Sequence, residues 1–321
     1  MTLLPTTKTA KEYSQKLGRK VLSTFWELVK IMVPVMIAVR VADQLGLTDW
    51  LGLALGPVMA WIGLPAEAGL VWGITLLIGV YGGLGAYFIL LPDIDISVAQ
   101  HSILCTMMLM AHFIPVEQAM VARAGAGFWI TSAVRVGTAL LFALILGAIT
   151  QATGWLGDPL ILAWTPDIGA DTGWVDWAMG IGWSLATILV IFFALFIALD
   201  ILERLGVIGL FSRALEPVLR VIGIDRRLAP MSTVGLLLGL IYCTGMMIQA
   251  SREHDFSPRA KLLALSLISF CHGLVEGTLL FLALGADIWI VLVARLIFTF
   301  AFMAIMAKLV SHWPTPKMRP A

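Results

Sequence analysis

The chain has 321 residues, of which 60% are hydrophobic and only 13% are charged. A soluble domain has roughly 45–50% apolar and about 25% charged residues, so this composition excludes a soluble globular protein and predicts a multi-pass membrane protein in a lipid bilayer. The 21 Lys and Arg nearly balance the 20 Asp and Glu, and this net charge of +1 does not indicate a nucleic-acid partner.

Apolar segments long enough to cross a bilayer, which takes about 20 residues, recur along the whole chain. Eight of them lie at about 22–45, 68–90, 97–122, 128–150, 183–205, 230–250, 260–284 and 288–310. They leave no room for a soluble domain. The basic segment 1–21 comes before an apolar run that is too long for a signal peptide and lacks a small-residue cleavage site, so we expect it to be retained.

The chain also matches itself without gaps at an offset of 160 residues. The matched pairs include residue types that rarely agree by chance: His112 with His272, Asp95 with Asp255, Trp129 with Trp289, Arg135 with Arg295, and Pro57 with Pro217. This pattern predicts a duplication. We expect repeats at 22–150 and 182–310, an acidic external linker at 151–181, and a cytoplasmic tail at 311–321.

The distribution of Lys and Arg, which accumulate in cytoplasmic loops, favours opposite orientations of the two repeats. If all eight segments crossed, the five basic residues of 1–21 would lie opposite the four arginines of 213–227. If 68–90 and 230–250 instead enter and return on one side, the loop Lys and Arg fall on the cytoplasmic side. We therefore expect an all-α polytopic protein of the bacterial inner membrane, with two inverted-topology repeats, six crossings, and both termini cytoplasmic.

Each expected re-entrant hairpin carries glycines in its middle, in "LLIGVYGGLGAYF" and "LLLGLIYCTGMMI". Half-helices of about 10 residues reach only about 15 Å, so the tips lie near mid-membrane, where exposed backbone must be buried in protein or line a wet cavity. The candidate substrate contacts at the tips are Tyr81, Gly82, Gly83, Gly85, Tyr242, Cys243, Thr244 and Gly245. Alternatively, the glycines only permit close helix packing. One interfacial helix per repeat is expected at 51–63 and 210–223.

One pattern occurs twice: a helix ending in Leu-Gly, a segment with a central Pro and a terminal Gly, and a Gly-interrupted run. The first copy reads "VADQLG", "LGPVMAWIG" and "GITLLIGVYGGLGA", and the second "DILERLG", "LEPVLRVIG" and "VGLLLGLIYCTGMMI". These stretches resemble the Gate domain, also called the nucleoside recognition domain. Related domains occur in the membrane part of the bacterial ferrous-iron permease, in concentrative nucleoside transporters and in paired sporulation proteins.

The chain departs from these relatives in three respects. The GTP-binding motif GxxxxGK[ST] of the iron permease is absent. Cys243 has Gly83 as its counterpart, so a symmetric pair of hairpin thiols is missing. The tips "VYGGLG" and "IYCTGM" lack the Gln-Thr-Glu signature of a nucleoside transporter. The resemblance therefore implies the fold rather than the substrate.

Inverted repeats with broken or re-entrant helices are typical of secondary transporters. We expect transport of a small polar solute, anionic or nucleoside-like, by alternating access. A lone charge at the bilayer centre costs about 3 kcal/mol or more, so Glu117 should pair with Arg135 and Glu276 with Arg295 as structural clamps. Alternatively these residues line the pathway, where His112 and His272 would carry protons. The candidate pathway residues are His112, Glu117, Arg135, His272, Glu276 and Arg295.

Other polar residues suggest two further sites. Arg40 aligns with Asp200 in the repeat, and a bridge between them would gate the two halves. Cys105, Met108 and His112 share one helix face, and Cys271 with His272 lies in the other half. Thiolate, thioether and imidazole suit a soft transition metal, so a ferrous-iron or copper permease is an alternative function.

A non-transporting assembly or regulatory subunit is a second alternative. We find no zinc motif, no Gly-x-Ser-x-Gly and no paired-Asp arrangement, and we expect neither an enzyme nor a cofactor. The expected partners are the bilayer and a small-molecule or ion substrate, and a homo-oligomer is compatible with the sequence.

Overall fold

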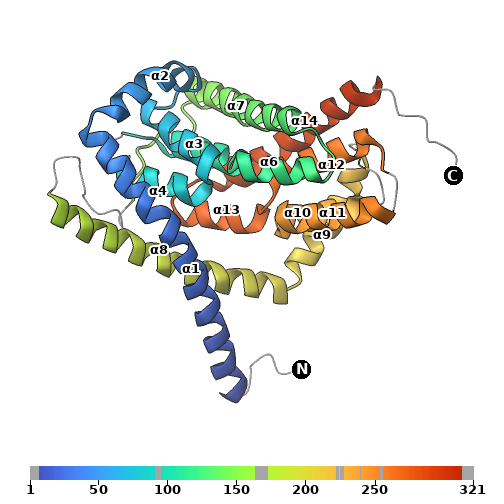
Figure 1. Ribbon diagram of the computed structural model, residues 1–321, viewed down its shortest axis with the longest axis horizontal. Helices are drawn as coiled ribbons and strands as arrows, with labels where there is room; N and C mark the ends of the chain where they lie inside the picture. Colours follow the sequence, from blue (N-terminus) through green and yellow to red (C-terminus); the bar gives the residue numbers. More distant parts are fainter. Residues whose placement is uncertain are drawn as a thin grey trace.

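The computed structural model describes residues 7–90, 95–162, 173–221, 224, 228–238, 240–253 and 256–312. These residues form helices and connecting turns, and they contain no β-strand beyond an isolated bridge between Ser97 and Pro159 (Figure 1). The all-α membrane fold expected from the composition is confirmed.

Six helical stretches among the described residues are long and apolar enough to cross a membrane, in agreement with the six expected crossings. They are most of α1 (Thr7–Gln44), α5 (Val98–Met110) with α6 (Ile114–Arg123), α7 (Phe128–Thr153), α8 (Trp174–Arg204), α12 (Pro258–Cys271) with α13 (Leu274–Ala283), and η2 (Trp289–Ala294) with α14 (Arg295–Leu309). Two of these stretches are interrupted in the middle, and both interruptions belong to the candidate site.

Shorter helices follow α1 and α8. They are α2 (Leu47–Ile62), α3 (Ala66–Ile78) and α4 (Val80–Leu90) in the first half, and α9 (Val207–Val221), α10 (Ala229–Leu238) and α11 (Leu240–Glu253) in the second. The chain bends by 102° between α2 and α3. Gly63 takes φ +80 at this bend, a conformation that glycine adopts without strain.

Helices α3 and α4 form a tight hairpin that turns at Gly79, where φ is +110. A Cβ atom added to Gly83 would lie 1.8 Å from Thr75 Oγ1 on the facing helix, and one added to Gly85 would lie 3.2 Å from the Met32 carbonyl oxygen of α1. A Cβ at Gly82 would meet Ile78 at 2.7 Å. These three glycines are buried and permit close packing, and their contact with substrate stays a prediction.

The elements of the first half recur about 160 residues later. The short helices α2 and α9 begin at Leu47 and Val207, each directly after a left-handed glycine. Ser97 and Ser257 each accept a hydrogen bond from the backbone N–H three residues on, and so cap the next helix. The repeat in the sequence therefore has a counterpart in the order of the elements.

The stretches α5–α6 and α12–α13 run antiparallel to each other. The Asp287 amide, just beyond α13, donates to Ser102 Oγ near the start of α5 at 2.8 Å. At the other end, a Cβ added to Gly125, just beyond α6, would lie 3.0 Å from Lys261 Cδ in α12. Asp95, Asp158 and Asp287 therefore gather at one end of the helix bundle, and Arg123, Arg259 and Lys261 at the other.

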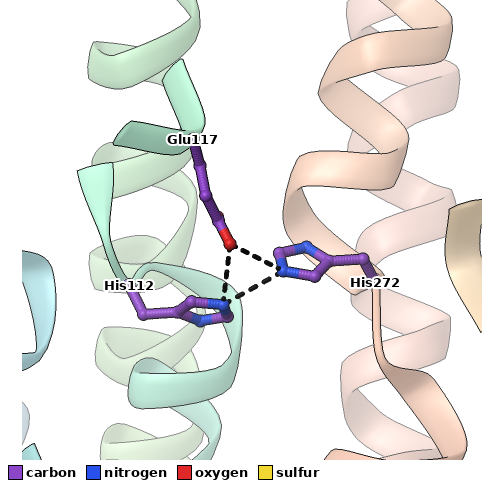
Figure 2. Close-up of side chains that lie close together, drawn as sticks. All are labelled: His112, Glu117 and His272. Atoms are coloured by element: carbon purple, nitrogen blue, oxygen red, sulfur yellow. Dashed lines mark hydrogen bonds and ion pairs between the residues drawn. The ribbon is translucent and has the colours of Figure 1, made fainter. Parts of the chain in front are cut away.

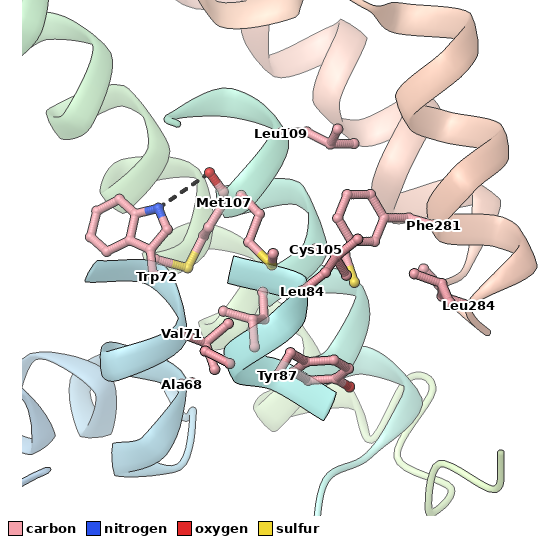
Figure 3. Close-up of a cluster of buried hydrophobic side chains, with 14 of the residues drawn as sticks. Ala68, Val71, Trp72, Leu84, Tyr87, Cys105, Met107, Leu109, Phe281 and Leu284 are labelled. Atoms are coloured by element: carbon pink, nitrogen blue, oxygen red, sulfur yellow. Dashed lines mark hydrogen bonds between the residues drawn. The ribbon is translucent and has the colours of Figure 1, made fainter. Parts of the chain in front are cut away.

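The hairpin of the first half packs against helices of both halves. Figure 3 shows Val71 and Trp72 of α3 and Leu84 of α4 beside Met107 of α5, with Phe281 of α13 close by. The Trp72 indole N–H donates to the Met107 carbonyl at 3.3 Å. This buried cluster fixes the hairpin next to the interruption between α5 and α6.

Candidate functional site

The candidate site lies where two helical stretches are interrupted, one in each half of the chain. Helix α5 ends at Met110 and α6 begins at Ile114, with Phe113 in a left-handed conformation at φ +47. Pro115, in the first turn of α6, has no N–H to continue the preceding helix. In the second half, α12 ends at Cys271 and α13 begins at Leu274, and the left-handed residue is Gly273 at φ +61.

A histidine lies in each interruption, and the two imidazoles meet across the junction of the halves (Figure 2). Their Nε2 atoms are 3.0 Å apart. Glu117 of α6 reaches the same point: its Oε1 lies 3.4 Å from His112 Nε2 and 3.3 Å from His272 Nε2. Residues far apart in the chain thus form one centre, which we call the junction centre: His112, Glu117 and His272.

Backbone carbonyls determine the protonation of both rings. His112 Nδ1 lies 2.8 Å from the Met108 carbonyl oxygen, and His272 Nδ1 lies 3.1 Å from that of Ile268. A carbonyl only accepts, so each Nδ1 carries a hydrogen, and a neutral ring then presents a lone pair at Nε2. Two nitrogen lone pairs and a carboxylate oxygen therefore converge, and this arrangement requires a proton or a cation between them.

Arg135 of α7 fixes Glu117. Its Nη1 forms an ion pair with Glu117 Oε2, and its Nε donates to the Met110 carbonyl at 2.9 Å, at the end of α5. The Arg135 side chain is fully buried. The expected Glu117–Arg135 pair is present, and it leaves Glu117 Oε1 facing the histidines.

The second half lacks the matching pair, so the expected Glu276–Arg295 clamp is wrong. Arg295 is buried and donates from Nη2 to the His272 carbonyl at 3.4 Å, while its Nε and Nη1 have no hydrogen-bond partner among the described residues. The position equivalent to Glu117 is Gly277. Glu276 is one residue earlier, about 100° around the helix, and its side chain faces a cavity instead.

This cavity, which we call the vestibule, has a volume of about 580 Å³ and lies between α1, α8, α10 and α13. Glu276 lies within electrostatic reach of Lys20 and also interacts with Tyr81 of α4. Tyr81 is thus the residue of the first hairpin that takes part in the site. The polar and charged residues that line the vestibule are Lys16, Lys20, Thr24, Asp200, Glu203 and Glu276.

The expected Arg40–Asp200 bridge is also wrong. Asp200 lines the vestibule opposite Lys16 and Lys20, and it forms an ion pair of 2.7 Å with Arg204 on its own helix. Arg40 lies on the same helix as Lys20, and 20 residues of α-helix span about 30 Å. Residues at equivalent positions of the two repeats therefore need not meet: His112 and His272 do, and Arg40 and Asp200 do not.

The expected sulfur ligands do not reach the junction centre. Cys105 Sγ lies 3.5 Å from His101 Nε2, and His101 in turn bonds the Tyr87 hydroxyl. Cys271 is buried in the core of the second half. Among the described residues, the junction centre is the one group of three or more His, Cys, Asp or Glu whose ligand atoms lie within 4.8 Å of one another. The expected metal set is therefore corrected at Cys105 and Cys271.

The tip of the second hairpin holds the other four expected substrate contacts. The side chains of Tyr242 and Cys243 lie outside the described residues. Thr244 is buried and donates to the Leu240 carbonyl at 2.9 Å, and a Cβ added to Gly245 would meet no atom within 4 Å.

The fold and the site define a multi-pass α-helical membrane protein with a polar centre between its two halves. Residues 185–313 match the model of the Gate family, described as nucleoside recognition. YvoD of Bacillus subtilis (strain 168), described as an uncharacterized membrane protein, is 29% identical over 276 residues, which cover 85% of this chain and 86% of the relative. No solved structure matches the chain. The resemblance found in the sequence is confirmed.

Proposed function

We propose that this protein is a secondary-type transporter that moves a small polar solute across the membrane by alternating access between two inverted repeats. One observation carries the proposal: an interrupted helix from each half contributes a histidine to one centre, about midway along both membrane-length stretches. Interrupted helices that meet near the middle of the membrane are the usual substrate and ion sites of transporters with inverted repeats.

The cost of this arrangement supports a functional role. Each interruption frees backbone groups, and in hydrocarbon such groups are tolerated only where protein buries them or where they line a wet cavity. Polar and ionisable residues inside a membrane are also costly. The junction centre combines both costs at one place, whereas packing alone would need neither.

The vestibule gives the proposed substrate its chemical class. Its volume of about 580 Å³ falls within the range of small-molecule sites, about 300–1,000 Å³. Lys16 and Lys20 face Asp200, Glu203 and Glu276 across it. Charges of both signs suit a zwitterion or a polar solute such as a nucleoside better than an apolar compound.

The contacts between the halves support the inverted topology. Antiparallel α5–α6 and α12–α13 are what an odd number of crossings per repeat requires. The end that holds Asp95, Asp158 and Asp287 would face outward, and the end that holds Arg123, Arg259 and Lys261 would face the cytoplasm. Both termini then lie on the cytoplasmic side of the plasma membrane.

Ligand screening followed by uptake tests the proposal. Purified protein is heated with nucleosides, amino acids and organic anions, since specific binding raises the melting temperature, and each hit is then assayed for uptake into proteoliposomes. We expect at least one hit to be taken up, and Glu276→Gln to weaken its binding while Glu67→Gln, an exposed carboxylate on α3, does not. Binding without uptake of any hit would support a non-transporting subunit instead.

A further inference from the structure

We infer that the junction centre of His112, Glu117 and His272 binds a divalent first-row transition-metal ion, held between the two halves of the protein. The inference deepens the proposed function, because it names an ion at the same centre. It replaces the sulfur-based set expected from the sequence with two imidazoles and one carboxylate.

The three ligand atoms have the spacing of a coordination sphere. His112 Nε2, His272 Nε2 and Glu117 Oε1 form a triangle with sides of 3.0, 3.3 and 3.4 Å. Two ligands about 2.1 Å from one metal ion are about 3.0 Å apart at an angle of 90° and about 3.4 Å apart in a tetrahedron. An ion equidistant from the three atoms fits about 1 Å out of their plane.

The surroundings hold these atoms in the state that a metal requires. A ligating histidine must be neutral at the bound nitrogen, and it usually donates its other N–H to a carbonyl or carboxylate, which orients the ring. Met108 and Ile268 supply these carbonyls. Arg135 holds Glu117 Oε2 and so directs Oε1 toward the histidines.

The donor set selects the class of ion. Imidazole with one carboxylate suits iron, zinc, manganese or cobalt as dications, whereas magnesium and calcium prefer oxygen ligands and copper(I) prefers sulfur. Cys105 and Cys271 are not among the clustered ligand atoms of the described residues. The His112 and His272 side chains keep 11% and 8% of their surface exposed, so a small ion and a bound water can reach the centre.

Cobalt is the probe that tests this site. The full chain is purified through a tag without histidine, treated with a chelator, and titrated with Co²⁺ while the visible absorption of the bound ion is recorded. We expect one Co²⁺ per chain. We also expect His112→Gln and His272→Gln each to weaken binding beyond the ~10–100-fold that follows loss of an outer partner.

His101→Gln is the matched control, because His101 is also a buried histidine of the first half but bonds Tyr87 instead of the junction centre. Its Co²⁺ affinity should equal that of the unchanged protein. The inference is overturned if the unchanged protein binds no Co²⁺, a result that does not depend on any variant folding. It is also overturned if folded His112→Gln binds Co²⁺ as tightly as the unchanged protein.

The metal site and the proposed function can fail separately. Solute uptake is measured in the same proteoliposomes with chelator and with Co²⁺. If Co²⁺ binds but no solute is taken up, the metal site is supported and the transport function is refuted. If a solute is taken up by protein that binds no Co²⁺, the metal site is refuted and the transport function is supported.

Discussion

Glu117 makes two kinds of contact with one carboxylate. Its Oε2 neutralises Arg135, and its Oε1 faces both histidines. Removing one partner of a buried ion pair leaves an uncompensated charge, whereas replacing both partners by apolar groups is often nearly neutral. The two effects can be separated by mutation.

Glu117→Ala should lower the free energy of unfolding by about 3–5 kcal/mol, because Arg135 is left buried without its carboxylate. The double variant Glu117→Ala with Arg135→Met should recover much of this loss. The unfolding of both variants in detergent is followed by circular dichroism.

The exposed pair Glu27–Lys30 is the control. Its side chains are 70% and 50% exposed, so Glu27→Ala should cost no more than about 1 kcal/mol. If the losses of Glu117→Ala and Arg135→Met simply added in the double variant, the coupling inferred from the structure would be refuted.

The sequence predicts the residues of the junction centre but not their meeting. His112 and Glu117 are five positions apart, which on a continuous helix separates them by about 140°. The left-handed Phe113 interrupts the helix and turns both side chains toward His272. Pro115 and Gly273 are the features of the sequence from which these interruptions could have been predicted. Glu276 lies one position before the equivalent of Glu117, and this single residue turns its side chain toward the vestibule instead of Arg295. Matching the charged residues of the two repeats does not reveal so small a difference.

The hairpin of α3 and α4 depends on glycine at the positions where the two helices touch. Gly83 faces Thr75 so closely that an added Cβ would lie 1.8 Å from its hydroxyl oxygen. Thr75 is itself buried and bonded to the Val71 carbonyl at 2.8 Å, so it cannot turn aside freely.

Gly83→Ala should therefore lower the melting temperature of the purified protein, because the hairpin must open to admit a methyl group. Gly73→Ala, on the same hairpin, is the matched control: an added Cβ there meets no atom within 4 Å. Since Ala favours helix over Gly, this variant should be as stable as the unchanged protein or more so. Equal melting temperatures for the two variants would contradict the close packing.

The offset of 160 residues predicts which elements of the two halves correspond, and the structure repeats their order. The offset does not predict which corresponding residues touch. His112 and His272 meet, but Arg40 and Asp200 do not, because the packing of all the helices decides which equivalent residues come together.

The proposed inverted topology can be tested by labelling single cysteines with a reagent that does not cross membranes. In a background without the natural cysteines, Asp95→Cys and Asp158→Cys should react from outside the cell. Lys16→Cys and Arg213→Cys should react only once the cytoplasmic side is opened. All four native side chains are exposed, so reaction of all four from one side would exclude this topology.

Alternating access predicts that Val275 can be reached from each side of the membrane in turn. This residue lines the vestibule three positions after His272. In the structure, the vestibule lies among the charged ends of α1 and α8, at the proposed cytoplasmic side. Val275→Cys in the same background should react with an impermeant reagent from the cytoplasmic side. A fraction of the molecules should also react from the outer side, and this fraction should change when a transported solute is added. Reaction from one side alone, with and without solute, would contradict alternating access.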